Sequence, residues 1–132
     1  MTDYLLDTSA FLWSLGPAER LNRRAREIIE EAGQRVFFSA ASAWELSIKF
    51  ASGKLTLPEV PSLYVPSRIT YLGLRLLPVL NAHALLAGSL PRYHLDPFDR
   101  MLIAQAKTEG LTVITADPWF RRYNVDVLWC SK

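Results

Sequence analysis

The chain has little cysteine and no long apolar run, and each absence excludes a class of protein. Cys130 is the only cysteine among 132 residues, so no internal disulfide can form, and we expect a protein of the reducing cytoplasm. The longest apolar runs, such as Leu76–Leu80, are too short to cross a bilayer, which predicts no membrane contact. Asp3 and Asp7 stand where a signal peptide would carry basic and then apolar residues, so we expect a retained, structured N-terminus. The length predicts one compact domain over residues 1–132.

A large excess of charge is also missing. The formal net charge of +2 does not by itself indicate nucleic-acid binding, but arginines crowd into two short regions, 20–26 and 121–122. One reading is a solvated helix face with glutamates as partners. The other is a cationic rim that attracts a phosphate backbone. The candidates for such a rim are Arg20, Arg23, Arg100, Arg121 and Arg122.

Short apolar strands alternate with helices from one end of the chain to the other. We expect strands at 4–6, 36–38, 74–77, 111–114 and 125–129. We expect helices from Thr8 or Ser9 to Gly16-Pro17, from Asn22 as the N-cap to Gly33, from Ser39 or Ser42 to Gly53, and over 62–71, 81–87 and 97–110, with a helical turn at 118–123. Strands of this kind usually pair in parallel, with helices on both faces. The predicted fold is a single three-layer α/β domain with a central, mostly parallel sheet flanked by helices.

Acidic residues gather where the strands of such a sheet would end. Asp7 follows the first strand and Asp117 follows the fourth; Asp96 and Asp99 begin the helix before the fourth strand, and Glu45 stands in an otherwise apolar helix. Ligands of open parallel sheets bind beyond the carboxyl ends of the strands. Carboxylates brought together repel unless they are protonated or bridged by a cation, and their oxygens suit Mg²⁺ or Mn²⁺. The pattern therefore favours a metal site at this edge.

Each acid also has a structural alternative. Asp7 would cap the first helix, and Asp96, which precedes a proline, is more readily an N-cap than a ligand. Asp99 would favour the helix dipole, and Asp117 would be an ordinary turn residue. Glu45 would face solvent and pair with the lysine four residues later.

Four stretches of the chain carry a more specific pattern. They are Leu5-Leu6-Asp7-Thr8-Ser9, Ser39-Ala40-Ala41-Ser42-Ala43-Trp44-Glu45-Leu46, the run from His94 to Ala106, and Thr115-Ala116-Asp117. In their order and separations they resemble the PIN-domain family, and within it the VapC-like toxin ribonucleases. With their intervening helices they cover essentially the whole chain. The most specific is the run that begins His-Leu-Asp-Pro-Phe-Asp-Arg.

The resemblance implies roles for individual residues. The family's three core acidic positions and its more variable fourth correspond to Asp7, Glu45, Asp99 and Asp117, as catalytic residues and metal ligands. Hydroxyl positions that hold the acids or a metal-bound water correspond to Thr8, Ser9 and Thr115. Asp96 is an additional acid of the Asp-Pro-Phe-Asp subgroup and is expected to remain a cap. Tyr93 and Ala116 depart from the commonest pattern, which bears on substrate preference.

The activity that the resemblance implies is a Mg²⁺-dependent endoribonuclease, with Mn²⁺ as a possible substitute. One or two ions, held by Asp7 and Asp99 with Glu45 and Asp117 in support, would bind a scissile phosphate and make a water more acidic for in-line attack. Single-stranded or looped RNA is the implied substrate, with 5′-phosphate and 3′-hydroxyl products. No histidine base is needed, so the only two histidines, His83 and His94, are expected to be structural or to lie at the substrate rim.

The resemblance also implies partners. VapC-like proteins usually form homodimers and are inhibited by a VapB-like antitoxin, whose C-terminal segment lies across the groove and often presents a basic side chain. Apolar contacts for that segment are expected among five aromatic residues, whose alternative role is in the core: Trp13, Trp44, Phe50, Tyr64 and Tyr71.

Other acidic α/β proteins fit less well. A receiver domain needs a second acid near its first strand and a lysine after a late strand, where this chain has only Lys132. A haloacid-dehalogenase phosphatase needs Asp-x-Asp, and Ser9 occupies the second position. The serious alternative is a catalytically inactive PIN-like module that binds RNA or protein. Such modules usually lose a core acid, and the presence of all four here favours an active enzyme.

Overall fold

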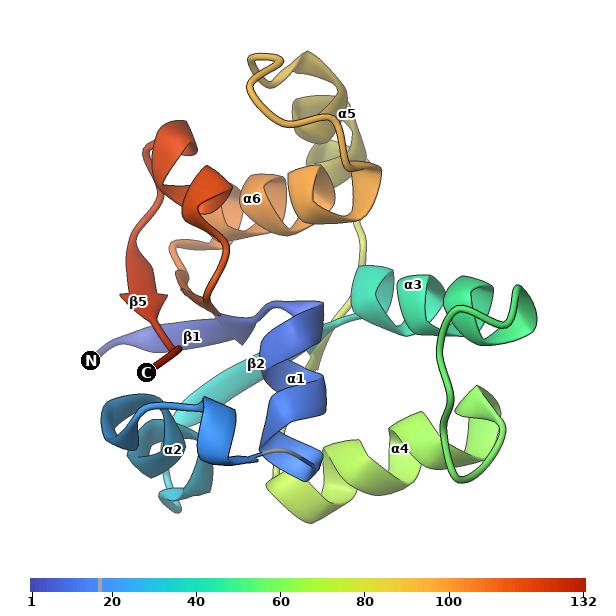
Figure 1. Cartoon of the computed structure of the whole chain (residues 1–132). Helices are drawn as coiled ribbons and strands as arrows, with labels where there is room; N and C mark the ends of the chain where they lie inside the picture. Colours follow the sequence, from blue (N-terminus) through green and yellow to red (C-terminus); the bar gives the residue numbers. More distant parts are fainter. Residues whose placement is uncertain (17) are drawn as a thin grey trace.

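A five-stranded parallel sheet forms the centre of the protein (Figure 1). The computed structural model describes residues 1–16 and 18–132; Pro17, expected at the end of the first helix, lies outside the described residues. The strands are β1 (Asp3–Leu6), β2 (Arg35–Ser39), β3 (Arg75–Leu77), β4 (Thr112–Thr115) and β5 (Val127–Trp129). Their order is β3-β2-β1-β4-β5, which places β1 in the middle and β4 beside it. The predicted α/β class and parallel sheet are confirmed.

Helices cover both faces of this sheet. They are α1 (Thr8–Leu15), α2 (Arg23–Glu30), α3 (Ala40–Ala51), α4 (Pro61–Leu72), α5 (Asn81–Ser89) and α6 (Pro97–Glu109), with 3₁₀ turns η1 (Ala18–Arg20) and η2 (Pro118–Tyr123). One face packs on α1, α2 and α4, and the other on α6 and η2, with α5 against α6 (Figure 1). Side chains alternate along β1: Tyr4 and Leu6 join the first core and Leu5 the second. Helix α3 contributes Leu46 to the first core and Ala41 to the second, so it closes one end of both layers.

Several helix ends differ from the sequence predictions; the helix expected over 81–87, for example, extends to Ser89. The N-cap of α1 is Asp7, whose side chain accepts from the backbone N–H of Ala10, so the prediction of Thr8 or Ser9 was wrong and its alternative was right. Helix α2 starts after Asn22 as predicted but ends at Glu30, three residues before Gly33, whose positive φ belongs to the turn into β2.

No helix within residues 1–16 and 18–132 has both the length and the apolarity needed to span a membrane.

Candidate metal centre at the carboxyl edge of the sheet

Asp7 stands at the junction between the central strand β1 and α1. Its Oδ1 accepts from the N–H of Ala10 at 2.7 Å, and its Oδ2 accepts from the hydroxyl of Thr115 at 2.6 Å. The residue is only 5% exposed, and this burial raises the pKa of its carboxyl to about 6, although both hydrogen bonds favour the ionised form. Asp7 is therefore a helix cap and a member of the site at once.

Thr115 links Asp7 to a second acid across the sheet. It ends β4, the strand beside β1, and its side chain is fully buried. Its hydroxyl donates to Asp7 and accepts from the backbone N–H of Asp117 at 3.0 Å. Asp117 in turn caps η2, because its Oδ1 accepts from the N–H of Trp119 at 3.0 Å. The parallel pairing of β1 with β4 is what brings these acids together.

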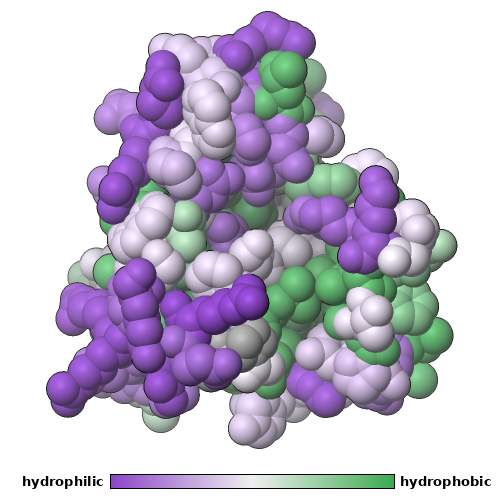
Figure 2. Space-filling view, viewed as in Figure 1, coloured by the Kyte–Doolittle hydropathy of each residue, from purple (hydrophilic) through white to green (hydrophobic). Residues whose placement is uncertain are grey.

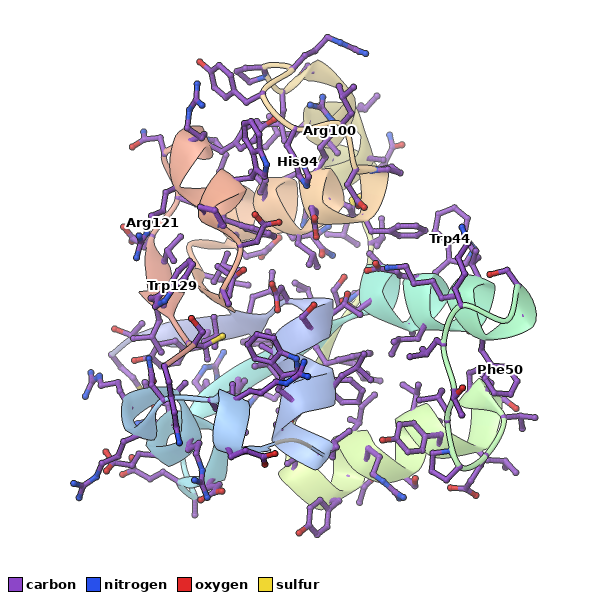
Figure 3. The ribbon with its side chains drawn as sticks, viewed as in Figure 1. Trp44, Phe50, His94, Arg100, Arg121 and Trp129 are labelled. Atoms are coloured by element: carbon purple, nitrogen blue, oxygen red, sulfur yellow. The ribbon has the colours of Figure 1, made fainter. Side chains whose placement is uncertain are left out.

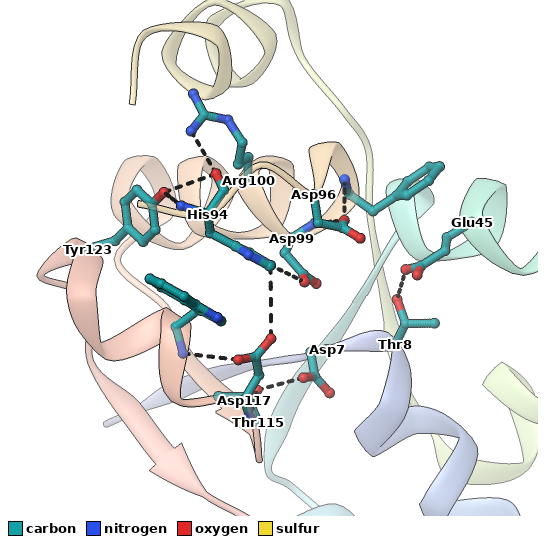
Figure 4. A network of polar contacts seen from close by, with 12 residues as sticks. Asp7, Thr8, Glu45, His94, Asp96, Asp99, Arg100, Thr115, Asp117 and Tyr123 are labelled. Carbon is teal, nitrogen blue, oxygen red and sulfur yellow. Dashed lines mark hydrogen bonds and ion pairs between the residues drawn. The ribbon is translucent and has the colours of Figure 1, made fainter. Parts of the chain in front are cut away.

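The start of α6 carries the next two acids, which differ in role. Asp96 is the N-cap, since its Oδ1 accepts from the N–H groups of Phe98 and Asp99 at 2.9 and 3.0 Å. Asp99, one turn later, points into the site, where its Oδ2 lies 2.9 Å from Nε2 of His94 (Figure 4). Burial, and after it the charges of neighbouring acids, raise the pKa of Asp99 to about 7, although the hydrogen bond with His94 favours the ionised form.

His94 lies among the acids, whereas the sequence predicted a structural position or one at the substrate rim for it. Its Nε2 is also 4.0 Å from Oδ2 of Asp117, so the imidazole stands between two carboxylates (Figure 4). Its position at the head of the most specific sequence stretch was the available signal. His83, by contrast, is fully buried and bonded to the N–H of Leu80 and to Glu109, which confirms a structural role.

Glu45 reaches the site from α3 and is 5% exposed. Its Oε1 accepts from the hydroxyl of Thr8 at 2.7 Å, and that hydroxyl also lies 2.9 Å from Oγ of Ser42. Its Oε2 pairs with Nζ of Lys49 at 2.5 Å, and this hydrogen bond raises the pKa of the lysine. The ion pair with Lys49 is the one that the structural alternative expected, but that alternative was wrong to place Glu45 in solvent.

All five acids line one pocket of about 400 Å³, together with Thr8, Ser9 and Lys49. Lys49 is a pocket residue that sequence reasoning missed, because it was considered only as a surface partner of Glu45. Ser9 is exposed at the pocket, whereas Thr8 is buried. The expected convergence of Asp7, Glu45, Asp96, Asp99 and Asp117 at the carboxyl edge of the sheet is thus observed.

The carboxylate oxygens of the pocket fit a hard divalent cation, and the imidazole of His94 adds one nitrogen donor beside them. One ligand atom each from His94, Asp99 and Asp117 lie within 4.8 Å of one another. The pKa values of Asp7 and Asp99 are raised because burial and mutual repulsion outweigh the hydrogen bonds that favour their charged forms. A bound cation would supply the missing positive charge, and carboxylate oxygens are the donors that Mg²⁺ and Mn²⁺ prefer.

Of the arginines expected at a cationic rim, Arg20, Arg121 and Arg122 lie against aromatic rings. Arg23 has an acidic partner instead. The guanidinium carbon of Arg20 lies 5.8 Å from the ring centroid of Trp13, a residue of the acidic pocket. Arg23 forms an exposed ion pair with Glu27, as the solvated-face reading expected. The other two aromatic contacts are Arg121 over Trp129 (Figure 3) and Arg122 over Tyr93 and Trp119.

Arg100 does not belong to the rim, and that prediction was wrong. Its side chain is buried, and Nη2 donates to the carbonyls of Ala87 and Leu90 at 2.8 and 3.0 Å. Nη1 donates to the carbonyls of Pro91 and His94 at 2.9 and 3.1 Å. The guanidinium is therefore used to fix the α5–α6 connection to α6 and is unavailable to a phosphate.

The aromatic residues considered for partner contacts divide between core and surface. Tyr64 is buried in the core, Phe50 and Trp13 are half-buried, and Trp44 and Tyr71 are 64% and 78% exposed. Hydrophobic side chains gather on the face around α3 and α4 (Figure 2). This face has the apolar character that a protein partner needs.

Known proteins match this chain both in sequence and in fold. The sequence model of the PIN domain matches residues 4–126. Ribonuclease VapC16 of Mycobacterium tuberculosis is 41% identical over 58 residues, which are 44% of this chain and 41% of the length of that relative. The crystal structure of VapBC2 from Rickettsia felis, bound to a promoter DNA fragment, superposes with a TM-score of 0.74 at 14% identity, over 98% of this chain and 100% of that one. The crystal structure of FitAcB from Neisseria gonorrhoeae gives a TM-score of 0.65 at 26% identity over 96% of both chains.

Proposed function

The chain belongs to the PIN-domain family, and from this premise we propose that it is a Mg²⁺-dependent endoribonuclease, the toxin of a VapBC-type pair. The observation that carries the proposal is the convergence of Asp7, Glu45, Asp99 and Asp117, from four separate segments, on one pocket. Burying these carboxylates together is electrostatically unfavourable, and a domain that only binds RNA does not require it.

The residues have different tasks in this proposal. Asp7, Asp99 and Asp117 hold the metal, and Glu45 supports them through its contacts with Thr8 and Lys49. Mg²⁺ bound there would supply Lewis-acid chemistry, making a water more acidic and offsetting phosphate charge. Thr115 fixes Asp7 and the backbone at Asp117, while the exposed hydroxyl of Ser9 is free to hold a water at the pocket.

Substrate and partners follow from the surroundings of the pocket. RNA is the proposed substrate, guided by Arg20, Arg121 and Arg122, with Arg23 at the margin of this rim. The proposed partners are a VapB-like antitoxin and a second copy of this chain, because the solved structures with this fold include a toxin–antitoxin complex from Klebsiella pneumoniae and the α3–α4 face is apolar. A cytoplasmic location, where RNA is met, belongs to the same proposal.

Cleavage of an RNA panel by the purified protein tests the proposal. The panel contains structured and unstructured RNA, with Mg²⁺ or Mn²⁺ compared with EDTA. We expect metal-dependent cleavage that falls by a factor of at least ~100 in Asp7→Asn and in Asp99→Asn, because each removes a charge that holds the metal. Thermal melting first establishes that both variants are folded.

The inactive binding module is the competing outcome of this experiment. Wild-type protein that cuts no RNA better than the two variants, while still binding it, would replace the nuclease proposal by that module.

A further inference from the structure

Aromatic and cationic side chains form a continuous wall beside the acidic pocket. The ring of Trp119 lies nearly parallel to the imidazole of His94, at 6° and 5.7 Å between centroids. The guanidinium carbon of Arg122 lies 4.7 Å from the ring centroid of Tyr93 and 5.6 Å from that of Trp119. One arginine therefore bridges two aromatic rings that come from different segments of the chain.

This wall is open to solvent on its outer side, although the ring of Tyr93 also packs on the core residue Tyr123, with 5.3 Å between the ring centroids. Tyr93 and Trp119 are 45% and 40% exposed, and Arg122 is exposed as well. Within residues 1–16 and 18–132, Arg122 forms no ion pair with an acidic side chain. Its positive charge is available to a ligand, and its planar group already lies against aromatic surface.

The loop that carries Tyr93 is held on both sides. Arg100 donates to the carbonyls of Pro91 and His94. The hydroxyl of Tyr123 donates to the carbonyl of Pro91 at 2.8 Å and accepts from the N–H of His94 at 2.7 Å. A ligand that binds here meets a preorganised wall and avoids the cost of ordering it.

The wall is also tied directly to the acids. Trp119 follows Pro118, which lines the acidic pocket, and its N–H donates to Asp117. Its stacking partner His94 contacts Asp99 (Figure 4). A flat ligand stacked on this wall therefore lies next to whatever occupies the metal centre.

We propose that Tyr93, Trp119 and Arg122 form a nucleotide subsite for single-stranded RNA beside the acidic pocket. A base stacks on the combined aromatic and guanidinium surface of the wall, and the charge of Arg122 attracts a neighbouring phosphate. Unpaired bases stack on aromatic and guanidinium planes, while a duplex keeps its bases inside, so the wall selects single-stranded or looped RNA. This inference rests on the proposed function, since it assigns residues that bind the RNA substrate of the same site.

Binding of a short fluorescent single-stranded RNA, followed by anisotropy, tests the subsite separately from catalysis. The measurement is made in Ca²⁺, with a gel to show that the RNA stays intact. Tyr93→Ala and Trp119→Ala each weaken binding about tenfold, as expected for loss of one base stack. Trp119→Phe, which keeps a ring, stays close to wild type. Arg122→Gln weakens binding and lowers the slope of log affinity against log salt by about 0.7, one phosphate contact, whereas Tyr93→Ala leaves the slope unchanged.

Matched controls lie on α4, away from the pocket. Tyr71 is an exposed aromatic residue, and Arg68 stacks on Tyr64 at 4.7 Å, as Arg122 does on Tyr93. Tyr71→Ala and Arg68→Gln are therefore expected to leave RNA affinity unchanged. Circular dichroism melting shows that all variants fold.

An abasic substitution in the RNA separates stacking from a structural effect. Removing the base that occupies the subsite weakens binding by the wild type but adds nothing to the loss in Tyr93→Ala, because both changes delete the same contact. Equal sensitivity of the two proteins to the abasic position overturns the subsite even if the enzyme cuts RNA. Wild type that neither binds nor cuts RNA overturns the proposed function together with the subsite. Variants that keep RNA affinity but lose an antitoxin peptide identify a protein-docking surface instead.

Discussion

At the scale of single residues, one buried hydroxyl organises two of the acids. Thr115 donates to Asp7 and accepts from the N–H of Asp117. We expect Thr115→Val to lower RNA cleavage by about a factor of ten or more, because it leaves an oxygen of Asp7 without its donor. Thr115→Ser keeps the hydroxyl and should retain most of the rate. Equal activity of the Val and Ser variants, measured as initial rates at saturating Mg²⁺, would contradict this role.

A second residue-scale prediction concerns Lys49, the one cation that lines the pocket among the described residues. Its Nζ pairs with Glu45, so its charge opposes that of a metal in the same pocket. We expect Lys49→Met to bind Mg²⁺ about threefold to tenfold more tightly, because a repelling charge is removed. Titration calorimetry measures this affinity, and Lys54→Met, at an exposed lysine outside the pocket, is the control. Weaker binding would mean that Lys49 instead holds Glu45 in place.

At the scale of secondary-structure elements, Arg100 joins α6 to the end of α5 and to the loop after it. Replacement by Met removes four hydrogen bonds to backbone carbonyls, and the carbonyls of Ala87 and Leu90 have no other side-chain donor among the described residues, so we expect the free energy of unfolding to fall by about 3 kcal/mol. Arg100→Lys keeps the charge but lacks the forked geometry and should recover only part of this loss. Urea denaturation measures the change, and limited proteolysis should show cleavage after residue 89. Arg92→Met, at an exposed position of the same loop, should be neutral.

The elements themselves were largely predictable, because their signals are local. Asn22 and Asp96 cap the helices that their neighbours suggested, and β1 and β4 follow from short apolar runs. The edge at which the acids meet follows from parallel pairing. The hydrogen-bond partners of the side chains could not be predicted from the sequence, because they depend on how elements that are distant in the sequence pack together. Thr8 and Glu45 are 37 positions apart, and no local pattern shows that this contact removes Thr8 from capping α1.

Arg100 and His94 illustrate the same difficulty within one short stretch. Both belong to the most specific motif, yet one side chain turns into the α5–α6 loop and the other toward Asp99. The residue type alone predicts that an arginine is exposed, and it predicts neither burial nor exposure for a histidine. The fold of the loop decides that His94 faces the acidic pocket and that Arg100 does not.

At the scale of the whole molecule, the acids should link the stability of the fold to the proposed binding of a metal. Asp7 and Asp99 have pKa values of about 6 and about 7, above the ordinary value for aspartate of 3.8. Between about pH 4 and pH 7 the folded state therefore holds more protons than the unfolded state, so metal-free stability must fall as pH rises through this window. Mg²⁺ should reverse the loss at the upper end, because it binds the ionised carboxylates.

We therefore expect the metal-free protein to melt at a higher temperature near pH 5 than near pH 8, and Mg²⁺ to raise the melting temperature mainly near pH 8. Asp99→Asn should flatten both the pH dependence and the Mg²⁺ dependence of the melting temperature, since its amide does not titrate.

The thiol of Cys130 offers an independent measure of how often the core opens. Burial raises the pKa of this thiol to about 12, so a thiol reagent reacts only after the core opens. Its labelling rate in EDTA should increase from pH 5 to pH 8 by more than thiol ionisation explains, and Mg²⁺ should suppress that excess. Metal-free stability that rises steadily over this range would show that the acids are ionised without a cation, and the electrostatic argument for a metal centre would fail.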